Sequence, residues 1–476
     1  MPCKQLLSLT VLVLIHIGAV RADTIHVHPG ESIQAAIDSA LNGDEIVVHP
    51  GTYAGLLDFH GKAITLRSLN GAGVTTIDGQ QSGPVVTCRN GEDLDTVLEG
   101  FLITGGNGAI NGGGMYIRNA GPTIRDCIFR GNLAEYGGGI FADSAYPVFS
   151  HCIFEENSAA SSGGGLYLYK CAAEPRPTLT DCRFCENDAG SSGGGLRNWD
   201  SAPKLLRCVF YDNRALYSGG GAANGGTSST TYTNCIFEAN RADTLFGNWN
   251  SYGGGMCNYE TAQTTLINCL FLANTAVAFA PRISHGGAVA NSGQVQLTLI
   301  NCTLHANHAA QGDACANMES AALVAANSIF WNDGQEIAFT GTVFPEISYS
   351  CVQNGWPGPG IISEYPQFDG SRLHPYSPCI NAGDPKYGPP GMRDLDGHSR
   401  LLYGHVDMGA YEFGIGDYDW DLDVDAHDFV VGFRCMNGPD NGPYSAGCES
   451  LDFELDQDVD LQDFAAFQRL VGSDTF

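Results

Sequence analysis

The chain has few basic residues and no segment long and apolar enough to span a membrane. Lys and Arg total 23 against 52 Asp and Glu, which gives a formal net charge of −29 over 476 residues. Such a surface repels phosphate backbones, so nucleic acid is excluded as a partner. Proline is not abundant, and apolar content is ordinary. The 62 glycines therefore indicate repeated turns rather than a disordered chain.

The N-terminus predicts an export signal over residues 1–22. Lys4 supplies a positive start, and residues 6–17 form an apolar core of about a dozen residues. Small residues at Val20 and Ala22 stand at the cleavage spacing before Asp23. The alternative, a retained membrane anchor, needs a longer apolar core. We expect a secreted chain, extracellular or associated with a cell surface, with no transmembrane segment after cleavage.

One phrase recurs along the chain: a glycine triplet, a variable segment, and then Cys-x-Phe or a close variant with an Asn five residues after the Cys. Spacing between the cysteines runs from 25 to 34 residues, whereas the offset from Cys to Asn never changes. Stacked coils require this, because strands must stay in register while a loop at one corner can lengthen. The repeated cysteines are Cys127, Cys152, Cys182, Cys208, Cys235, Cys269 and Cys302, and their asparagines are Asn132, Asn157, Asn187, Asn213, Asn240, Asn274 and Asn307.

Within a copy, side chains alternate with period two, and no helical spacing of apolar residues is present. Glycine triplets suit corners that need positive φ and coils that approach closely. The sequence therefore predicts an all-β solenoid, a parallel β-helix, and the rule for parallel crossovers makes it right-handed. Stacked cysteines point in parallel about 4.8 Å apart, so we expect buried free thiols rather than disulfides. A metal-binding cysteine ladder is the alternative, but no His or Asp keeps a matching register.

The glycine triplets with Phe-x-x-Asn resemble the repeats of polymorphic outer-membrane proteins. Residues 33–37, 42–48 and 50–53 are similar to the start of pectin-lyase-like β-helix proteins, in which a short amphipathic helix caps the coil stack. Residues 377–384 and 406–413 resemble the closing region of such proteins. The resemblance implies an N-terminal cap with first coils over 23–104, repeats over 105–335 and closing coils over 336–414. It implies the fold far more strongly than the chemistry.

Composition changes after Gly414, and residues 417–476 hold thirteen Asp and two Glu against two Arg. Two sets of acidic residues fall at positions 1, 3, 5, 7, 9 and 12 of a loop, a spacing at which oxygen ligands can surround Ca²⁺. Cys435 and Cys448 lie between the loops and are expected to form a disulfide, with Cys351 and Cys379 as a second candidate pair. The predicted calcium ligands are Asp417, Asp419, Asp421, Asp423, Asp425 and Asp428 in the first loop and Asp452, Glu454, Asp456, Asp458, Asp460 and Asp463 in the second.

Two such loops, with helical apolar spacing after the second, make residues 415–476 similar to a type I dockerin, a small module with EF-hand-like loops. The resemblance implies a cohesin-like partner; the alternative is a calcium-stabilised module that attaches to another surface protein. Two departures from the dockerin pattern occur. Position 6, usually Gly, holds Leu422 and Gln457, and positions 10 and 11 lack small hydroxyl residues.

The repeats offer two kinds of functional residue. A lyase needs acids with a nearby Arg or Lys as base, and a binding surface needs exposed aromatic rings. We favour a scaffold that binds polysaccharide or a cell-surface partner; a polysaccharide lyase or glycoside hydrolase is the alternative. Asp394-Leu395-Asp396-Gly397 predicts a simple turn or a weak calcium site. The lyase candidates are Asp126, Asp181, Arg125, Arg183, Arg197 and Arg207, and the aromatic candidates are Trp199, Trp249, Trp331 and Trp356.

Overall fold

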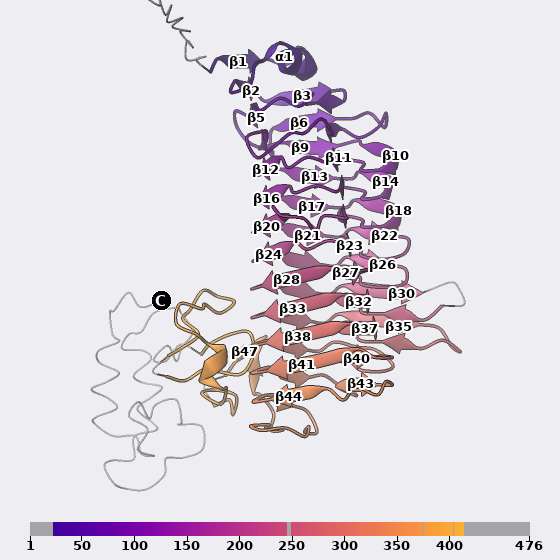
Figure 1. The fold of residues 1–476 in the computed structure, drawn as a ribbon, viewed down its shortest axis with the longest axis vertical. Coiled ribbons are helices and arrows are strands. Elements are labelled where there is room, and N and C mark those ends of the chain that lie inside the picture. The colour runs from indigo at the N-terminus through magenta and orange to yellow at the C-terminus, as the bar shows by residue number, and fades with distance from the viewer. Residues whose placement is uncertain (1–21, 245–248, 375, 403, 414–476) are drawn as a thin grey trace, which may run out of the picture.

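A computed structural model describes residues 22–244, 249–374, 376–402 and 404–413. Their strands stack into four long parallel sheets, here named A to D, along one axis (Figure 1). This confirms the predicted parallel β-helix. None of the described helices is long and apolar enough to cross a membrane. Residues 415–476, including the twelve predicted calcium ligands and Cys435 and Cys448, lie outside the described residues.

Sheets A and B form two sides of each coil, and one short turn joins a strand of sheet A to the following strand of sheet B. Sheet A contains β1 (Thr24–Val27), β2 (Glu45–Val48), β5 (Thr65–Ser68), β8 (Val97–Glu99), β12 (Thr123–Arg125), β16 (Val148–Ser150), β20 (Thr178–Thr180), β24 (Lys204–Leu206), β28 (Ser229–Thr233), β33 (Gln263–Ile267), β38 (Gln296–Ile300), β41 (Ala322–Ala326) and β44 (Glu346–Ser348). Sheet B contains β3 (Gly51–Ala54), β6 (Thr75–Asp78), β9 (Leu102–Thr104), β13 (Ile128–Arg130), β17 (Ile153–Glu155), β21 (Arg183–Cys185), β25 (Val209–Tyr211), β29 (Ile236–Glu238), β34 (Leu270–Leu272), β39 (Thr303–His305), β42 (Ile329–Trp331) and β45 (Cys351–Val352).

Sheet C completes each coil, and sheet D lies along one edge of the stack. Sheet C contains β4 (Leu57–Asp58), β7 (Val86–Cys88), β11 (Met115–Arg118), β15 (Ile140–Asp143), β19 (Leu166–Tyr169), β23 (Leu196–Trp199), β27 (Ala222–Gly225), β32 (Met256–Glu260), β37 (Val289–Gly293), β40 (Cys315–Asn317) and β43 (Ile337–Phe339). Sheet D contains β10 (Asn107–Asn111), β14 (Leu133–Tyr136), β18 (Ser158–Ser162), β22 (Asp188–Ala189), β26 (Arg214–Ala215), β30 (Arg241–Thr244) and β35 (Thr275–Ala278). Two small pairs remain, β31 (Ser251–Tyr252) with β36 (Ser284–His285), and β46 (Phe368–Asp369) with β47 (Arg372–Leu373).

Helix α1 (Ile33–Ser39) covers the N-terminal end of the stack, as the sequence predicts (Figure 1). The Ser32 side chain caps it by accepting a hydrogen bond from the Ala35 backbone N–H at 3.1 Å. Ile33 and Ile37 lie on the buried face of the helix. These side chains shield the first coil, whose apolar interior would otherwise be open to water.

Equivalent residues of successive coils lie directly above one another in the core. The rings of Phe154, Phe184, Phe210 and Phe237 stack in sheet B, with adjacent centroids 4.5–4.7 Å apart and nearly parallel planes. The seven repeated cysteines are buried beside them as free thiols, which confirms that prediction. Cys351 and Cys379, the second candidate pair, are buried free thiols in contact with each other: the structure brings the two side chains together without a disulfide bond between them.

Each of the three positions of a glycine triplet requires glycine for a different steric reason. Gly219 has a φ of +65°, which favours glycine. A Cβ on Gly220 would lie 2.4 Å from the Arg241 nitrogen in sheet D and 2.5 Å from the Gly254 oxygen. A Cβ on Gly221 would lie 2.7 Å from the Gly255 oxygen of the next coil. The triplets thus both turn the chain and let sheets C and D come together.

The asparagines of the repeat form a continuous buried ladder beside the phenylalanine stack. Asn213 Nδ2 donates to Asn240 Oδ1 at 2.9 Å and to the Phe184 carbonyl at 2.8 Å. Its own Oδ1 accepts from the backbone N–H and from Nδ2 of Asn187 at 3.1 and 2.9 Å. The same pattern links Asn132 through Asn307 to Asn332. Each side chain therefore satisfies the polar groups of a tight turn that water cannot reach.

A carboxylate ends this ladder. Glu336 Oε1 accepts from the Asn332 backbone N–H and Oε2 accepts from Asn332 Nδ2, both at 2.6 Å. Burial raises the pKa of Glu336 to about 7, against the effect of these hydrogen bonds. The folded chain therefore holds this proton more tightly than the unfolded chain, in which the pKa lies near the ordinary value of 4.5.

We expect the free energy of unfolding to fall by on the order of 2–3 kcal/mol as pH rises from about 4.5 to about 7, because Glu336 then ionises in a buried site. The contribution of Glu336 to the free energy of unfolding is fully present below the pKa of the unfolded chain. It is lost as the pH rises through the pKa of the folded chain. Denaturant titrations at several pH values measure it. Glu336→Gln should reduce the slope, and an unchanged slope in the variant would contradict the assignment.

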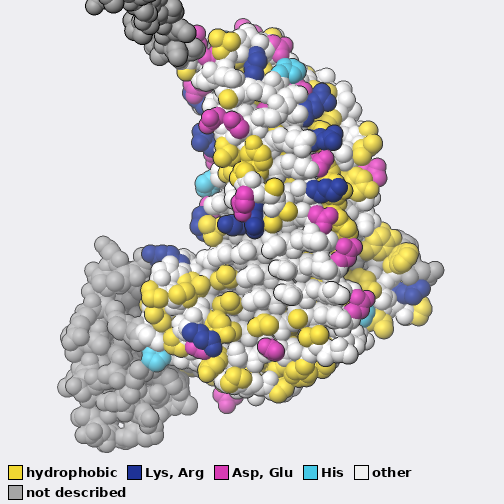
Figure 2. Space-filling model, in the orientation of Figure 1, with side chains coloured by type: hydrophobic (Ala, Val, Ile, Leu, Met, Phe, Trp, Pro, Cys, Tyr) yellow, Lys and Arg dark blue, Asp and Glu magenta, His cyan; other side chains and the backbone are white. Residues whose placement is uncertain are grey.

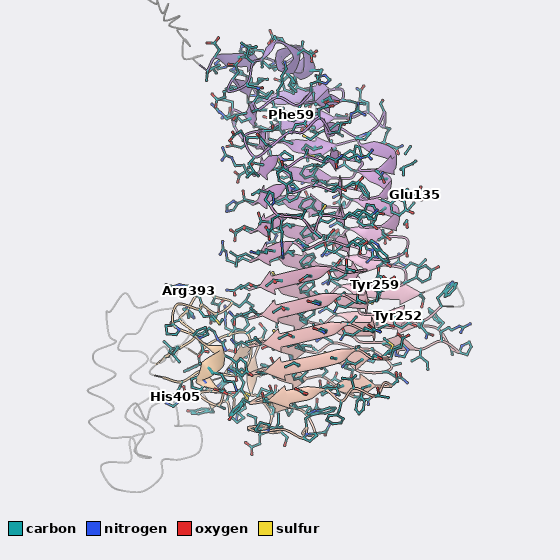
Figure 3. All side chains as sticks on the ribbon, in the orientation of Figure 1. Phe59, Glu135, Tyr252, Tyr259, Arg393 and His405 are labelled. Atoms are coloured by element: carbon teal, nitrogen blue, oxygen red, sulfur yellow. The ribbon has the colours of Figure 1, made fainter. Side chains whose placement is uncertain are left out.

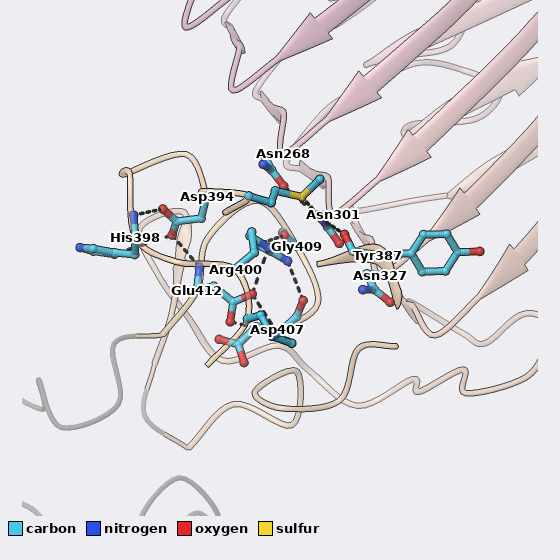
Figure 4. Close-up of polar contacts among 12 residues, drawn as sticks. Asn268, Asn301, Asn327, Tyr387, Asp394, His398, Arg400, Asp407, Gly409 and Glu412 are labelled. Carbon is cyan, nitrogen blue, oxygen red and sulfur yellow. Dashed lines mark hydrogen bonds and ion pairs between the residues drawn. The ribbon is translucent and has the colours of Figure 1, made fainter. Parts of the chain in front are cut away.

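The closing segment is held by a buried charged network (Figure 4). Arg400 is fully buried; it pairs with Glu412 at 3.0 Å and donates to the carbonyls of Asp407 and Gly409, both at 2.9 Å. The Asp407 carboxylate accepts from the Asn381 and Phe413 backbone N–H groups. Burial raises the pKa of Asp407 to about 6, against the effect of these hydrogen bonds. The network joins parts of the closing segment that are distant in sequence.

This segment is docked on a column of asparagines at the corner between sheets A and B. Asn268 Nδ2 donates to the Arg393 carbonyl at 2.7 Å, and Asn301 Nδ2 donates to the Tyr387 carbonyl at 3.0 Å. Asn327 exchanges two hydrogen bonds with the Asp384 backbone. All three asparagines have positive φ, which Asn tolerates better than most residues. The same residue type therefore forms the turn and binds the closing segment.

Candidate functional site

The structure separates the residues predicted for a lyase. Asp126 and Asp181 lie at the corner between sheets A and B, whereas Arg125 is on sheet A, Arg183 on sheet B and Arg197 on sheet C. Asp126, Arg183 and Arg197 therefore do not share one side of the coil, and of the six candidates the structure pairs Asp181 with Arg207.

Asp181 at this corner is engaged in an ion pair. Asp181 binds Arg207 through two hydrogen bonds of 2.7 and 2.8 Å, and the Arg207 hydrogen bond lowers the pKa of Asp181. Arg125 similarly pairs with Glu99 at 2.7 Å. On the face drawn in Figure 2, charged side chains of both signs lie over the N-terminal coils and fewer lie over the C-terminal ones. Paired surface charges of this kind contribute little to stability and offer no free base.

The four predicted tryptophans have different environments. Trp356 stacks on Phe344 at 5.3 Å and packs against the core, so it closes the C-terminal end of the stack. Trp331 contacts Tyr365. Trp249 is 66% exposed on a loop that projects from the sheet D edge. Hydrophobic side chains gather on this projection in Figure 2. Trp199 lies on the outer side of sheet C, near further aromatic side chains of that sheet.

These aromatic side chains cover the outer face of sheet C, and we call this surface the sheet C aromatic face. Alternate residues of each strand point outward, so residues in register on successive strands become neighbours. Ring contacts of 5.2–6.4 Å join one group of its rings, and a contact of 5.8 Å joins Trp199 to Tyr259; Arg197 links the two groups through Tyr167. Phe141 and Tyr167 are buried, whereas the other rings are partly exposed, and Tyr136 reaches the face from sheet D. Its residues are Tyr116, Tyr136, Phe141, Tyr167, Tyr169, Trp199 and Tyr259.

A single glycine makes the contact between Trp199 and Tyr259 possible. Gly225 occupies the intervening strand β27 in register with Trp199. A Cβ on Gly225 would lie 2.4 Å from the Tyr259 ring and 3.0 Å from the Trp199 ring. The two rings therefore approach to 5.8 Å across a coil that carries no side chain at this point. Figure 3 labels Tyr259 on this part of the stack.

Arg197 lies beside both of these rings. Its guanidinium carbon is 4.7 Å from the Trp199 ring centroid and 4.6 Å from that of Tyr259, distances at which a cation is attracted to an aromatic face. Nη1 donates to the carbonyls of Asn198 and Ala223, both at 3.3 Å. Burial raises the pKa of Tyr259 to about 12, although Arg197 opposes this shift. The phenol therefore stays protonated at neutral pH.

The sequence pointed to Trp199 and Arg197 but missed Tyr167, Tyr259 and Gly225. The available signal was the alternation after each glycine triplet, where the second and fourth residues face outward. A second missed feature is an interior amide ladder on sheet C, in which Nδ2–Oδ1 bonds of 2.7–2.8 Å join successive asparagines. The ladder contains Asn198, Asn224, Asn258, Asn291 and Asn317.

No group of three His, Cys, Asp or Glu side chains is placed to hold a metal ion in the described parts of the chain. The possible calcium turn at Asp394 is a structural turn instead. Asp394 Oδ1 accepts from the backbone N–H groups of Asp396 and His398, and Oδ2 accepts from Glu412. These bonds engage the carboxylate within its own loop. The candidate site in the described part of the chain is therefore the sheet C aromatic face, with Arg197 packed against its rings.

Comparisons with known proteins agree with the architecture. Residues 65–214 match the family described as the right handed beta helix region. Pectate lyase Pel9A is 14% identical with a TM-score of 0.42, over 83% of this chain and 97% of that chain. The surface adhesin PfbA of Streptococcus pneumoniae is 12% identical with a TM-score of 0.35, over 69% of this chain and 86% of that chain. No curated protein matches the chain significantly. The chain is a right-handed parallel β-helix.

Proposed function

We propose that this protein is a secreted scaffold that binds a polysaccharide along the sheet C aromatic face. The observation that carries the proposal is the run of aromatic side chains over β11, β15, β19, β23 and β32, which are spaced by the coil repeat. A sugar ring presents an apolar face that packs well against an aromatic ring, and the burial of both is favourable. A linear polymer can use several such contacts at once.

The C-terminal module completes the proposal. Two acidic loops with calcium-ligand spacing would attach the β-helix to a cohesin-like or other cell-surface protein. An export signal over residues 1–22 would place both parts outside the cell. A rigid β-helix that carries both a binding face and an attachment module suits the role of a scaffold.

Affinity electrophoresis of the chain from residue 23 through a panel of polysaccharides tests the binding face. We expect Trp199→Ala to weaken binding by about 10- to 100-fold, or ~1.4–2.8 kcal/mol, because a half-buried ring is lost from the platform. Trp249→Ala is the matched control, since this side chain lies on the projecting loop. Equal binding by the wild type and Trp199→Ala would exclude this face.

Gly225→Ala tests the geometry without removing a contacting side chain. The added Cβ must displace the Tyr259 ring, so binding should weaken while the denaturation midpoint changes little. Gly73→Ala, at a glycine with open space around it, is the control. Chain shortening or new reducing ends in these assays would favour a lyase or hydrolase instead.

A further inference from the structure

Arg197 is a buried cation without an acidic partner. It is 4% exposed, and it forms no ion pair with any described residue. Arg400, the other buried arginine of the described chain, pairs with Glu412 at 3.0 Å and donates two bonds of 2.9 Å. Arg197 instead donates two longer bonds of 3.3 Å from Nη1 to carbonyls, and it also hydrogen-bonds the Tyr167 side chain. Removing a charge from water costs several kcal/mol unless an opposite charge offsets it.

Nearby carboxylates are engaged elsewhere. Asp143, on the same sheet, pairs with Arg118 at 3.4 Å. Asp200, which follows Trp199, accepts from the backbone N–H and hydroxyl of Thr227 at 2.9 and 3.0 Å. A second cation is present on this face, since Lys170 Nζ lies 4.9 Å from the Tyr169 ring centroid. Asp143 and Asp200 lie close enough to Lys170 to offset its charge, so Arg197 is the cation of this face that has no acidic partner in the described chain.

We propose that Arg197 receives an anionic substituent, a carboxylate or a sulfate ester, of the glycan bound on the sheet C aromatic face. This inference rests on the proposed function. No carboxylate of the described chain forms an ion pair with Arg197, and the planar guanidinium matches the paired oxygens of such an anion. The guanidinium packs against both Trp199 and Tyr259, so these contacts restrict its orientation before the ligand arrives. The ligand class is therefore an acidic sugar whose ring stacks while its anion meets Arg197.

Titration calorimetry with three matched polymers tests this proposal: a polyuronate, the same polymer with its carboxyl groups reduced to neutral alcohols, and a sulfated derivative of the neutral form. We expect wild-type protein to bind at least one charged form about tenfold or more tightly than the neutral form. The charged form that is preferred distinguishes carboxylate from sulfate. Arg197→Gln should abolish the preference while neutral binding persists.

Two controls keep the result interpretable. Arg197→Lys retains the positive charge but loses the paired N–H donors of the guanidinium. It should therefore keep only part of the preference for the charged polymer. Arg282→Gln removes an exposed arginine outside this face and should change nothing. Thermal denaturation of each variant shows that it is folded. Equal wild-type affinity for charged and neutral polymers would overturn the role of Arg197 and leave the binding face intact. Absence of binding to all three polymers and to the wider panel would overturn both.

Discussion

Replacing one asparagine in the middle of the buried ladder should destabilise the β-helix by about 3–6 kcal/mol. Asn213 makes four side-chain hydrogen bonds, to Asn187, Asn240 and the Phe184 carbonyl, and it is completely buried. Asn213→Ala leaves several of these partners without a hydrogen bond. Each buried polar group left unpaired costs about 1–3 kcal/mol.

Equilibrium denaturation with urea or guanidinium measures this loss. The matched control is Asn70→Ala, which makes the same chemical change at an exposed position and should alter stability by less than about 0.5 kcal/mol. The turn before Asn213 is formed by Asp212 at a φ of +49°, so the variant also loses the side chain that holds this turn against the next coil. A loss below about 1 kcal/mol would show that water enters the turn and replaces the amide.

Calcium removal should unfold residues 415–476 while the β-helix stays folded. The twelve predicted ligands are carboxylates, which repel one another without a cation between them. A ligand that binds only the folded state stabilises it by RT ln(1 + [L]/Kd), about 4 kcal/mol at a thousandfold excess over Kd. A chelator removes that contribution from a module too small to build a large core.

Calorimetry with added calcium and with chelator follows both transitions in one experiment. The transition of the module should disappear with chelator, and that of residues 23–413 should stay in place. Asp417→Asn with Asp452→Asn removes the first ligand of both loops and should give the same result with calcium present. Asp369→Asn, at an exposed acid of the β-helix, is the control. If the unfolding transition of the module is unchanged both by chelator and by the substitutions, the predicted calcium ligands are wrong.

The repeat was sufficient to predict the coils. A constant offset between Cys152 and Asn157, or between Cys235 and Asn240, can arise only if the same turn recurs in the same register. Free thiols followed from the geometry of stacked strands, and the need for glycine at Gly219 and Gly220 followed from positive φ and close coil contact. All of these depend on short-range geometry that every coil repeats.

The aromatic face could not be predicted in the same way. Trp199 and Tyr259 are sixty positions apart, and they meet because Gly225 lies between them on the intervening coil. Because loop lengths vary, vertical neighbours have to be aligned on the glycine triplets; Trp199, Gly225 and Tyr259 then all occupy the fourth position after the triplet. The separation of Asp126 from Arg197, which occupy different sides of the stack, likewise follows from the tertiary structure.

Local sequence therefore specified the coil, its corner residues and the buried ladders, because each depends on backbone geometry and on the polar groups of a single repeat. The stacking of coils decided which outward-facing side chains are in contact and which acidic side chains form ion pairs. It also decided that Arg197 has no acidic partner in the described chain. Asn268 and Asn301 show both levels at once. Their positive φ is a local property of the turn, whereas their role in holding residues 387–393 exists only after the closing segment folds back along the stack.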